Sequence, residues 1–199
     1  MNEPYSRLDT HPVAPATPVY HFLQGLPQRV KMSDPAIDVM TDLKRVKAVT
    51  TGPTVSIELA QQTMIGAGVR LLLVIDAGGH ILGVITARDI MGEKPVSYSS
   101  ENRVGRDSIL VEDIMTPVGA LEALDLEEVF QVRVGDVVTT LREAGRQHAL
   151  VIEKDANSGK PVVRGLFSAT QIGTQLGVEI ASNGRVQSFA ELEAMLVSG

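Results

Sequence analysis

The feature that most constrains how this chain can fold is an internal repeat, in which one pattern of residues occurs twice in the same order. An internal repeat predicts two copies of one structural unit. The copies differ in length where the second carries the longer polar stretch at residues 155–160. The matched positions are Asp38-Val39-Met40-Thr41 with Asp113-Ile114-Met115-Thr116, Ala67-Gly68 with Ala144-Gly145, Leu73-Val74-Ile75 with Leu150-Val151-Ile152, and Gly83, Thr86, Ala87 and Ile90 with Gly165, Ser168, Ala169 and Ile172.

Each copy reads as a short strand, a helix, two strands joined by a turn, and a second helix. In the first copy, apolar residues at three- and four-residue spacing predict a helix over Ile57–Ala67, which Gly68 ends. The continuous apolar run Leu71–Ile75 predicts a strand buried on both faces, and residues 77–80 predict the turn into a returning strand. The second copy predicts a helix over 134–144 and strands over 149–152 and 162–167.

The two units are expected to form one body, because a single unit of this size buries too little apolar surface alone. The predicted order is an N-terminal extension at 1–37, the first repeat at 38–95, a connector at 96–108, the second repeat at 109–177 and a C-terminal segment at 178–199. Residues 92–108 are rich in serine and mixed charge, which predicts an exposed connector without regular structure. In the last segment, residues 186–196 predict a short amphipathic helix that packs on the protein's own body or on a partner.

Composition excludes several classes of function. A formal charge of −6 and a pI near 5.2 disfavour binding to nucleic acid or to an anionic membrane, since both need an excess of cations. No apolar run approaches the roughly 20 residues that cross a bilayer, and the polar N-terminus lacks the apolar core of a secretory signal. The chain has no cysteine. We therefore expect a cytoplasmic protein without a disulfide framework.

The closing and opening phrases of the repeats carry a family resemblance. Gly83-Val84-Ile85-Thr86-Ala87-Arg88-Asp89-Ile90 and Asp113-Ile114-Met115-Thr116-Pro117 closely resemble the corresponding phrases of the cystathionine-β-synthase (CBS) domain. The resemblance extends over about residues 38 to 177 and includes both copies. It implies an α/β fold in which two tandem CBS-type β-α-β-β-α repeats pack into one Bateman module, as in free-standing bacterial CBS-pair proteins.

Thr86 and Asp89 stand three residues apart where a strand is expected to turn into a helix. That spacing is typical of a helix-capping pair, which needs no ligand. It also suits a ligand, since a helix N-terminus favours phosphate and a carboxylate accepts hydrogen bonds from ribose hydroxyls. The resemblance implies that Asp89 holds ribose and Thr86 contacts phosphate. Neighbouring Arg88 either adds a phosphate contact or is solvated.

Further candidate ligand contacts come from three other segments. By the resemblance, Val49, Thr50, Thr51 and Pro53 lie against the base of the ligand. In the second copy Ser168 keeps a hydroxyl, but Gln171 replaces the aspartate, and an amide is a weaker acceptor than a carboxylate. We therefore expect one competent site and one weakened or vacant site. His148, with Arg146, either faces the cleft or is an ordinary polar residue.

The leading hypothesis is a non-catalytic regulatory module that binds AMP, ADP, ATP or S-adenosylmethionine between its repeats. No cofactor is expected to be required, and the sequence lacks nucleophile, phosphate-loop and paired-histidine metal motifs. The alternative is a degenerate, ligand-free CBS-pair scaffold for dimerisation or partner binding. The resemblance implies a homodimer, in contact through the apolar stripes of Ile57–Ala67 and 134–144, that regulates an unknown protein partner.

Overall fold

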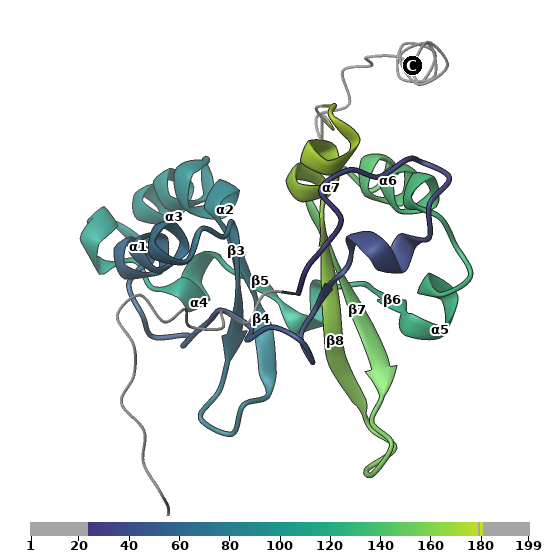
Figure 1. Ribbon diagram of the computed structural model, residues 1–199. Coiled ribbons are helices and arrows are strands. Elements are labelled where there is room, and N and C mark those ends of the chain that lie inside the picture. Colours follow the sequence, from purple (N-terminus) through teal and green to yellow (C-terminus); the bar gives the residue numbers. More distant parts are fainter. Residues whose placement is uncertain (1–23, 179, 181–199) are drawn as a thin grey trace, which may run out of the picture.

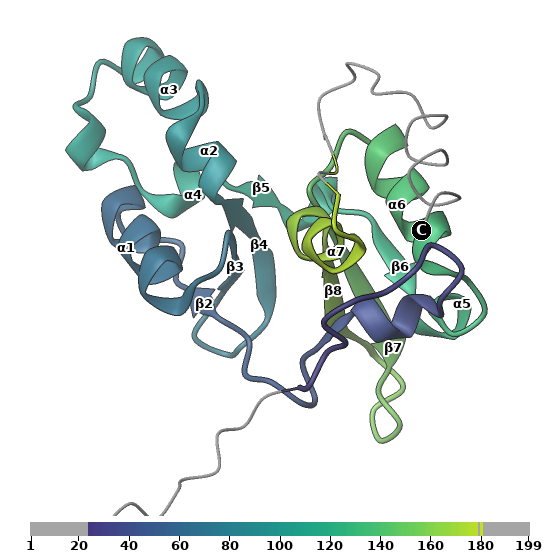
Figure 2. The ribbon, with the colours of Figure 1, turned by 45° about the horizontal axis from the view of Figure 1, so that its top comes forward.

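The computed structural model describes residues 24–178 and 180, which form two four-stranded sheets that face each other with helices on their outer sides (Figure 1). The view in Figure 2 shows α1 (Ile57–Ala67) and α3 (Lys94–Asn102) on the outside of one half, and α5 (Leu126–Val129) and α6 (Val134–Glu143) on the outside of the other. This is a mixed α/β fold built from two similar halves, as the repeat predicts. The predicted helix at 186–196 and residues 1–23 lie outside the described part of the chain.

The sheet of the first half has the strand order β2-β3-β4-β5. Its central hairpin joins β3 (Leu71–Ile75) to β4 (Ile81–Thr86), with β2 (Thr50–Thr51) and β5 (Thr116–Pro117) at its edges. The hairpin is flanked by α1 and by α2 (Ala87–Met91). The predicted end of α1 at Gly68 is confirmed, since this residue is left-handed with φ +65°.

The sheet of the second half has the matching order β1-β8-β7-β6. Its central hairpin joins β7 (His148–Lys154) to β8 (Pro161–Ser168), with β1 (Thr41–Asp42) and β6 (Ala123–Asp125) at its edges. Helix α6 precedes β7, and α7 (Ala169–Leu176) follows β8. The remaining short elements are η1 (Ala36–Val39), η2 (Arg106–Ser108), α4 (Val111–Ile114) and η3 (Val118–Ala120).

The two halves exchange their opening segments. Strand β1 opens the first copy in sequence but pairs with β8 of the second, with Thr41 opposite Leu166. Strand β5 of the second copy pairs in return with β4 of the first, with Thr116 opposite Val84. Each Asp-x-Met-Thr phrase therefore completes the sheet of the other copy, and neither sheet is formed by one repeat alone.

The exchange explains two of the repeated glycines. A Cβ atom at Gly83 would lie 2.4 Å from the Thr116 carbonyl oxygen, and one at Gly165 would lie 2.7 Å from the Thr41 carbonyl oxygen. Both distances are shorter than any contact that carbon and oxygen tolerate. Only glycine lets the exchanged strand approach this closely.

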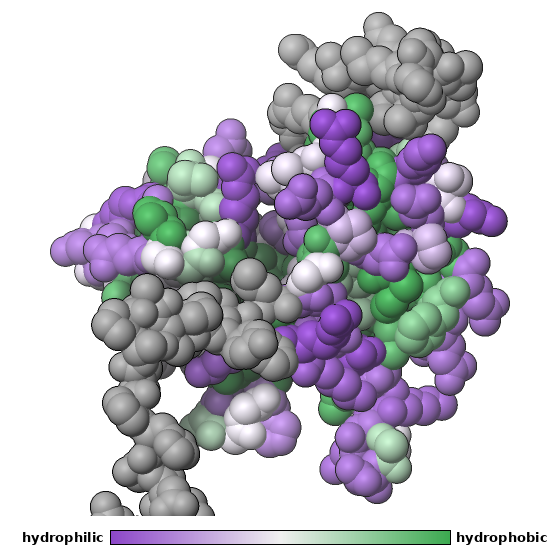
Figure 3. Space-filling model, viewed as in Figure 1, coloured by the Kyte–Doolittle hydropathy of each residue, from purple (hydrophilic) through white to green (hydrophobic). Residues whose placement is uncertain are grey.

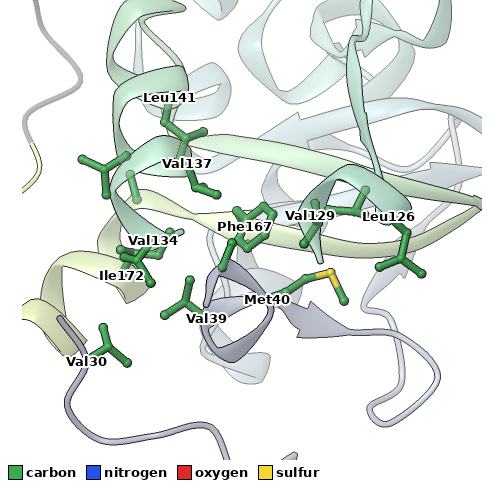
Figure 4. Close-up of a cluster of buried hydrophobic side chains, with 14 residues drawn as sticks. Val30, Val39, Met40, Leu126, Val129, Val134, Val137, Leu141, Phe167 and Ile172 are labelled. Atoms are coloured by element: carbon green, nitrogen blue, oxygen red, sulfur yellow. The ribbon is translucent and has the colours of Figure 1, made fainter. Parts of the chain in front are cut away.

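The interior has three apolar clusters, and the alternation along each strand divides its residues among them. In β3, Leu72 and Val74 point to the helices of the first half, whereas Leu71 and Leu73 point between the sheets toward Leu150 of β7. The predicted burial of this strand on both faces is thereby confirmed. Figure 4 shows the cluster of the second half, in which Phe167 lies among side chains of α6 and of the exchanged segment, including Met40.

The apolar stripes of the longer helices are used in these clusters. Ile57, Ala60 and Met64 of α1 are at most 2% exposed, and the corresponding side chains of α6 are equally buried. The sequence prediction that these stripes form a dimer contact is therefore wrong, because they already face the chain's own cores. Within residues 24–178 and 180, no helix has both the length and the apolar character needed to cross a membrane.

The connector contains a helix that the sequence does not predict. Residues 94–102 form α3, which starts with Pro95 in its first turn, a favourable position for proline. The Tyr98 hydroxyl donates to the Asp113 carboxylate at 2.6 Å, and the Asn102 side chain donates to the Tyr98 carbonyl. These polar contacts and the buried Pro95 hold α3 in place. An amphipathic repeat is not needed for such a helix, so the sequence pattern gave no sign of it.

Candidate functional site

Two clefts lie between the halves and are related by the repeat. The first, here called the carboxylate cleft, encloses about 360 Å³ and combines the start of α2 with residues 120–122 and 145–148 of the second copy. The second, here called the cationic cleft, encloses about 510 Å³ and combines the start of α7 with residues 46–49 and 67–71 of the first copy. Figure 3 shows that the surface is hollowed between the two halves. Each cleft therefore uses both copies of the repeat.

Thr86 and Asp89 form a reciprocal cap at the floor of the carboxylate cleft. The Asp89 Oδ2 atom accepts hydrogen bonds from the Thr86 backbone N–H at 2.8 Å and from its Oγ1 hydroxyl at 2.7 Å, while the Asp89 N–H donates to Thr86 Oγ1 at 3.2 Å. The capping interpretation of this pair is thus confirmed. Capping occupies Oδ2, which leaves Oδ1 for another donor.

In this structure that donor is Lys94, at the start of α3. Its Nζ ammonium lies 2.7 Å from Asp89 Oδ1 and donates to the Ile114 carbonyl oxygen at 3.0 Å. The Asp89 side chain is 14% exposed and that of Lys94 46% exposed, so water and small ligands reach this pair from the lysine side. A ligand hydroxyl that bonds Oδ1 therefore competes with Lys94.

The other charged side chains that line the carboxylate cleft include both positive and negative groups. Arg146 Nη2 and Glu122 Oε2 form an ion pair at 2.9 Å on the side of the second copy. Arg88, on the first turn of α2, also lines the cleft and has no ion-pair partner among residues 24–178 and 180. The cleft thus offers one free guanidinium beside a carboxylate that is engaged by a cap and a lysine.

His148 stands between the clefts and lines both of them. Burial, followed by the Arg70 guanidinium, lowers the pKa of its imidazole to about 4, although the Asp89 carboxylate acts in the opposite direction. The ring is therefore neutral at pH 7 and can donate one hydrogen bond and accept another. Leu71 occupies the matching position of the first copy and also lines both clefts.

The cationic cleft has no counterpart of the Asp89 carboxylate. Gln171 Oε1 accepts a hydrogen bond from Thr41 Oγ1 at 3.3 Å, and Gln171 Nε2 is buried without a hydrogen-bond partner. The Gln171 N–H reaches Ser168 Oγ at 3.5 Å, which is a weaker cap than that of Thr86 and Asp89. Lys47 and Arg70 also line this cleft.

Comparison with known protein families identifies the family of the first repeat. The model of the CBS domain family matches residues 36–95. These residues are a CBS domain. The second repeat has the same order of elements, so the two halves together have the architecture of a tandem CBS pair.

Several solved structures are similar to this chain. An uncharacterised conserved protein from Pyrococcus horikoshii is 23% identical with a TM-score of 0.52, over 80% of this chain and 99% of that one. A CBS-domain protein from Agrobacterium tumefaciens is 21% identical with a TM-score of 0.49, over 78% and 98% of the two chains. The CBS-pair protein CBSX2, known from Arabidopsis thaliana, is 20% identical in its complex with AMP, with a TM-score of 0.46 over 70% and 93%. No curated protein sequence is significantly similar to this chain.

The exchange within the CBS pair distributes the candidate residues over two clefts. Thr86, Arg88, Asp89 and His148 line the carboxylate cleft together. Val49, expected beside them, instead lines the cationic cleft with Ser168, and Thr50, Thr51 and Pro53 line neither of the two. The reason is that the segment before β2 faces the second half, since the preceding β1 belongs to that sheet.

The position facing Asp89 is filled by the second copy. Strand pairing matches Thr50 opposite Leu73 with Ala123 opposite Leu150, so Glu122 takes the place that Val49 has in the other cleft. Sequence reasoning missed Glu122, Lys47 and Arg70 as cleft residues. The repeat contains the signal for such residues, because aligning residues 46–49 with residues 119–122 shows that the two segments take matching positions in the two copies.

Proposed function

We propose that this CBS pair is a regulatory module that binds an adenine nucleotide or a related adenosyl compound in the carboxylate cleft. The observation that carries the proposal is the convergence of Asp89, Thr86 and the unpaired Arg88 in one cleft of about 360 Å³. Such a volume lies within the range of small-molecule sites, roughly 300–1,000 Å³. The family resemblance assigns ribose to Asp89 and phosphate to Thr86, and the same geometry supports both roles.

The proposed contacts follow from what each side chain offers. A ribose hydroxyl donates to Asp89 Oδ1, the oxygen that the helix cap leaves available. The Arg88 guanidinium and the start of α2 attract the phosphate. The apolar side chains of Leu71, Val84 and Leu121 line the same cleft and offer a surface for the base. The neutral His148 ring adds a polar contact at the inner wall.

Calorimetric titration with AMP, ADP and ATP tests the proposal. We expect binding that Asp89→Ala weakens about ten- to a hundredfold, which corresponds to about 1.5–3 kcal/mol for a hydrogen bond to a charged group. Gln171→Ala should change the same binding much less, because Gln171 lines the other cleft. Equal losses from the two variants, or no nucleotide binding by the unmodified protein, would contradict the assignment.

Asp136→Ala is a matched control for the helix cap. The Asp136 Oδ2 atom accepts a hydrogen bond from the Arg133 N–H at 2.8 Å at the start of α6, as Asp89 does at the start of α2, but Asp136 lines neither cleft. Both variants lose a cap, worth about 1 kcal/mol of stability. Only Asp89→Ala should lose nucleotide, so a binding loss shared by Asp136→Ala would indicate an effect through folding.

We further propose that the protein is a homodimer, with the first half as the contact. Several large apolar side chains of α1 to α3 are exposed, at 53% for Leu59, 74% for Ile65, 66% for Met91 and 69% for Val96. Covering such a group of side chains with a second copy would remove it from water. Light scattering should give twice the monomer mass, and Ile65→Asp should reduce it toward the monomer. A monomer at high concentration would contradict this proposal.

A further inference from the structure

The ammonium of Lys94 lies between the carboxylate cleft and a second hollow of the first half. This hollow, here called the α3–α4 groove, encloses about 420 Å³ and is lined by residues of α3, by Glu93 just before it and by residues 113–115. Lys94 lines the groove, yet its Nζ atom contacts Asp89 Oδ1 at 2.7 Å and the Ile114 carbonyl oxygen at 3.0 Å. Because Asp89 lines the carboxylate cleft, one side chain connects the two hollows.

The α3–α4 groove offers Lys94 a second set of partners. Glu93, Glu101 and Asp113 line it, and Lys94 is the only cation among the described residues of its lining. Neither glutamate forms an ion pair within residues 24–178 and 180. The Asp113 carboxylate accepts a hydrogen bond from the Tyr98 hydroxyl at 2.6 Å, which leaves its charge unbalanced by a cation there. An ammonium that turns into the groove is therefore attracted by several carboxylates.

A side chain with partners on both sides has two arrangements that a ligand can bias. In the arrangement of this structure, Lys94 occupies Asp89 Oδ1, the oxygen that the helix cap leaves available. A ribose hydroxyl at this oxygen removes one partner of the ammonium, while the carboxylates of the groove remain. A ligand shifts an equilibrium only if it binds the two arrangements differently, and a hydroxyl that needs the oxygen covered by Lys94 does so.

We propose that Lys94 is a switch through which occupancy of the carboxylate cleft is transmitted to α3: the bound ligand moves its ammonium from Asp89 into the α3–α4 groove. This inference rests on the proposed function, because it needs a ligand hydroxyl at Asp89. Helix α3 also carries Val96, which is 69% exposed and belongs to the proposed dimer contact. The switch thus connects the cleft to the exposed apolar face of the first half.

Calorimetric titration of the full chain with AMP tests the switch. Glu93→Gln combined with Glu101→Gln leaves the displaced ammonium with fewer partners, so AMP affinity should fall about two- to threefold. The direction is diagnostic, because AMP is an anion and the loss of negative charge alone would strengthen its binding. In the Lys94→Met background the same two substitutions should not lower the affinity. Glu112→Gln is the matched control, since it removes an exposed carboxylate of α4 that lines neither the groove nor the two clefts.

The outcomes separate this inference from the proposed function. A loss of AMP affinity that depends on Lys94 and is absent in Glu112→Gln supports the switch. An equal loss in the Lys94→Met background overturns it, as does an unchanged or higher affinity after the two glutamate substitutions, and in these cases AMP binding itself still stands. Absence of AMP binding by both the unmodified protein and Lys94→Met overturns the proposed function and the switch together. Binding by Lys94→Met alone supports both, because it shows that the lysine blocks Asp89.

Discussion

The carboxylate cleft and the cationic cleft are built from matched positions of one repeat and differ in almost every polar group. Asp89 matches Gln171, Glu122 matches Val49, and Gly145-Arg146 matches Gly68-Val69. Within residues 24–178 and 180, the first cleft therefore has paired charges of both signs beside the unpaired Arg88, while the second has two unpaired cations, Lys47 and Arg70, and no carboxylate. Matched backbone elements form both clefts, so we expect their different side chains to decide which ligand each one prefers.

The same contrast between shared backbone and different side chains is present where the exchanged strands join the sheets. In the second half, Arg164 Nη2 of β8 pairs with Asp42 Oδ2 of β1 at 2.7 Å, with side chains only 14% and 10% exposed. The repeat matches these residues with Leu82 and Pro117 in the first half, which form no ion pair. One strand exchange therefore includes a buried charge pair, whereas the matching positions of the other cannot form one.

Arg164→Leu, which copies the first half into the second, is expected to have the largest effect. It leaves the buried Asp42 carboxylate without its partner, a loss of about 3–5 kcal/mol in the free energy of unfolding. Denaturant unfolding measures this loss. Arg146→Leu, which breaks the exposed pair with Glu122, is the control and should cost less than about 1 kcal/mol. Similar losses in the two variants would mean that the Asp42–Arg164 pair contributes no more than a surface contact.

His148→Leu makes the inner wall of the clefts symmetric, since Leu71 is its counterpart. The folded state holds the pKa of His148 at about 4, under the influence of burial, Arg70 and Asp89, against the ordinary value of 6.5. Between these values the unfolded chain takes up a proton that the folded chain does not, so stability should fall as the pH drops from about 6.5 to 4. The loss is on the order of 3 kcal/mol and is complete below the folded pKa.

Unfolding free energies of both proteins across this pH range measure the His148 contribution. Carboxylates titrate in both proteins, so the difference between the two pH profiles isolates the histidine. We expect His148→Leu to lose less stability than the unmodified protein on acidification. Parallel profiles would show that His148 is solvated and titrates normally in the folded state.

The sequence predicted the hairpins and long helices but not how the halves combine. The period of the apolar residues and the capping pair Thr86–Asp89 are local signals, and the structure confirms both. The exchange of β1 and β5 is a long-range pairing that no local pattern encodes, so Val49 was expected in the cleft of Asp89. Helix α3 was missed because polar contacts such as that of Tyr98 with Asp113 stabilise it. The ligand roles of the site residues stay predictions.

Gln171→Asp tests whether one side chain is enough to convert the cationic cleft. A carboxylate there would lie in the same cleft as Arg70 and Lys47 and would restore the acceptor that Asp89 provides at the matching position of the other cleft. The same carboxylate offers an acceptor to a ribose hydroxyl, so the number of AMP molecules bound per chain should rise from one toward two. Calorimetry gives this number. A number that stays at one would show that a single carboxylate does not convert the cationic cleft.

Lys94→Met is expected to have the smallest effect and addresses how the carboxylate cleft is regulated. The repeat matches Lys94 with Leu176 in the second copy, and a leucine cannot form this ion pair. Its ammonium occupies Asp89 Oδ1 at 2.7 Å, the atom proposed to receive the ribose hydroxyl, so the unmodified protein must give up this contact on binding. A partly exposed ion pair is worth up to about 1 kcal/mol, and its removal should raise AMP affinity about two- to fivefold.

The direction of the Lys94→Met effect distinguishes two roles for the lysine. If Lys94 only competes for Asp89, AMP affinity rises. If Lys94 instead turns toward the phosphate of the bound nucleotide, AMP affinity falls, and the competition argument is wrong. Lys47→Met serves as the control, since that lysine lines the other cleft and should leave AMP affinity unchanged. A rise in AMP affinity would also indicate that ligand binding is coupled to the position of α3, because Lys94 bridges Asp89 to the Ile114 carbonyl of α4.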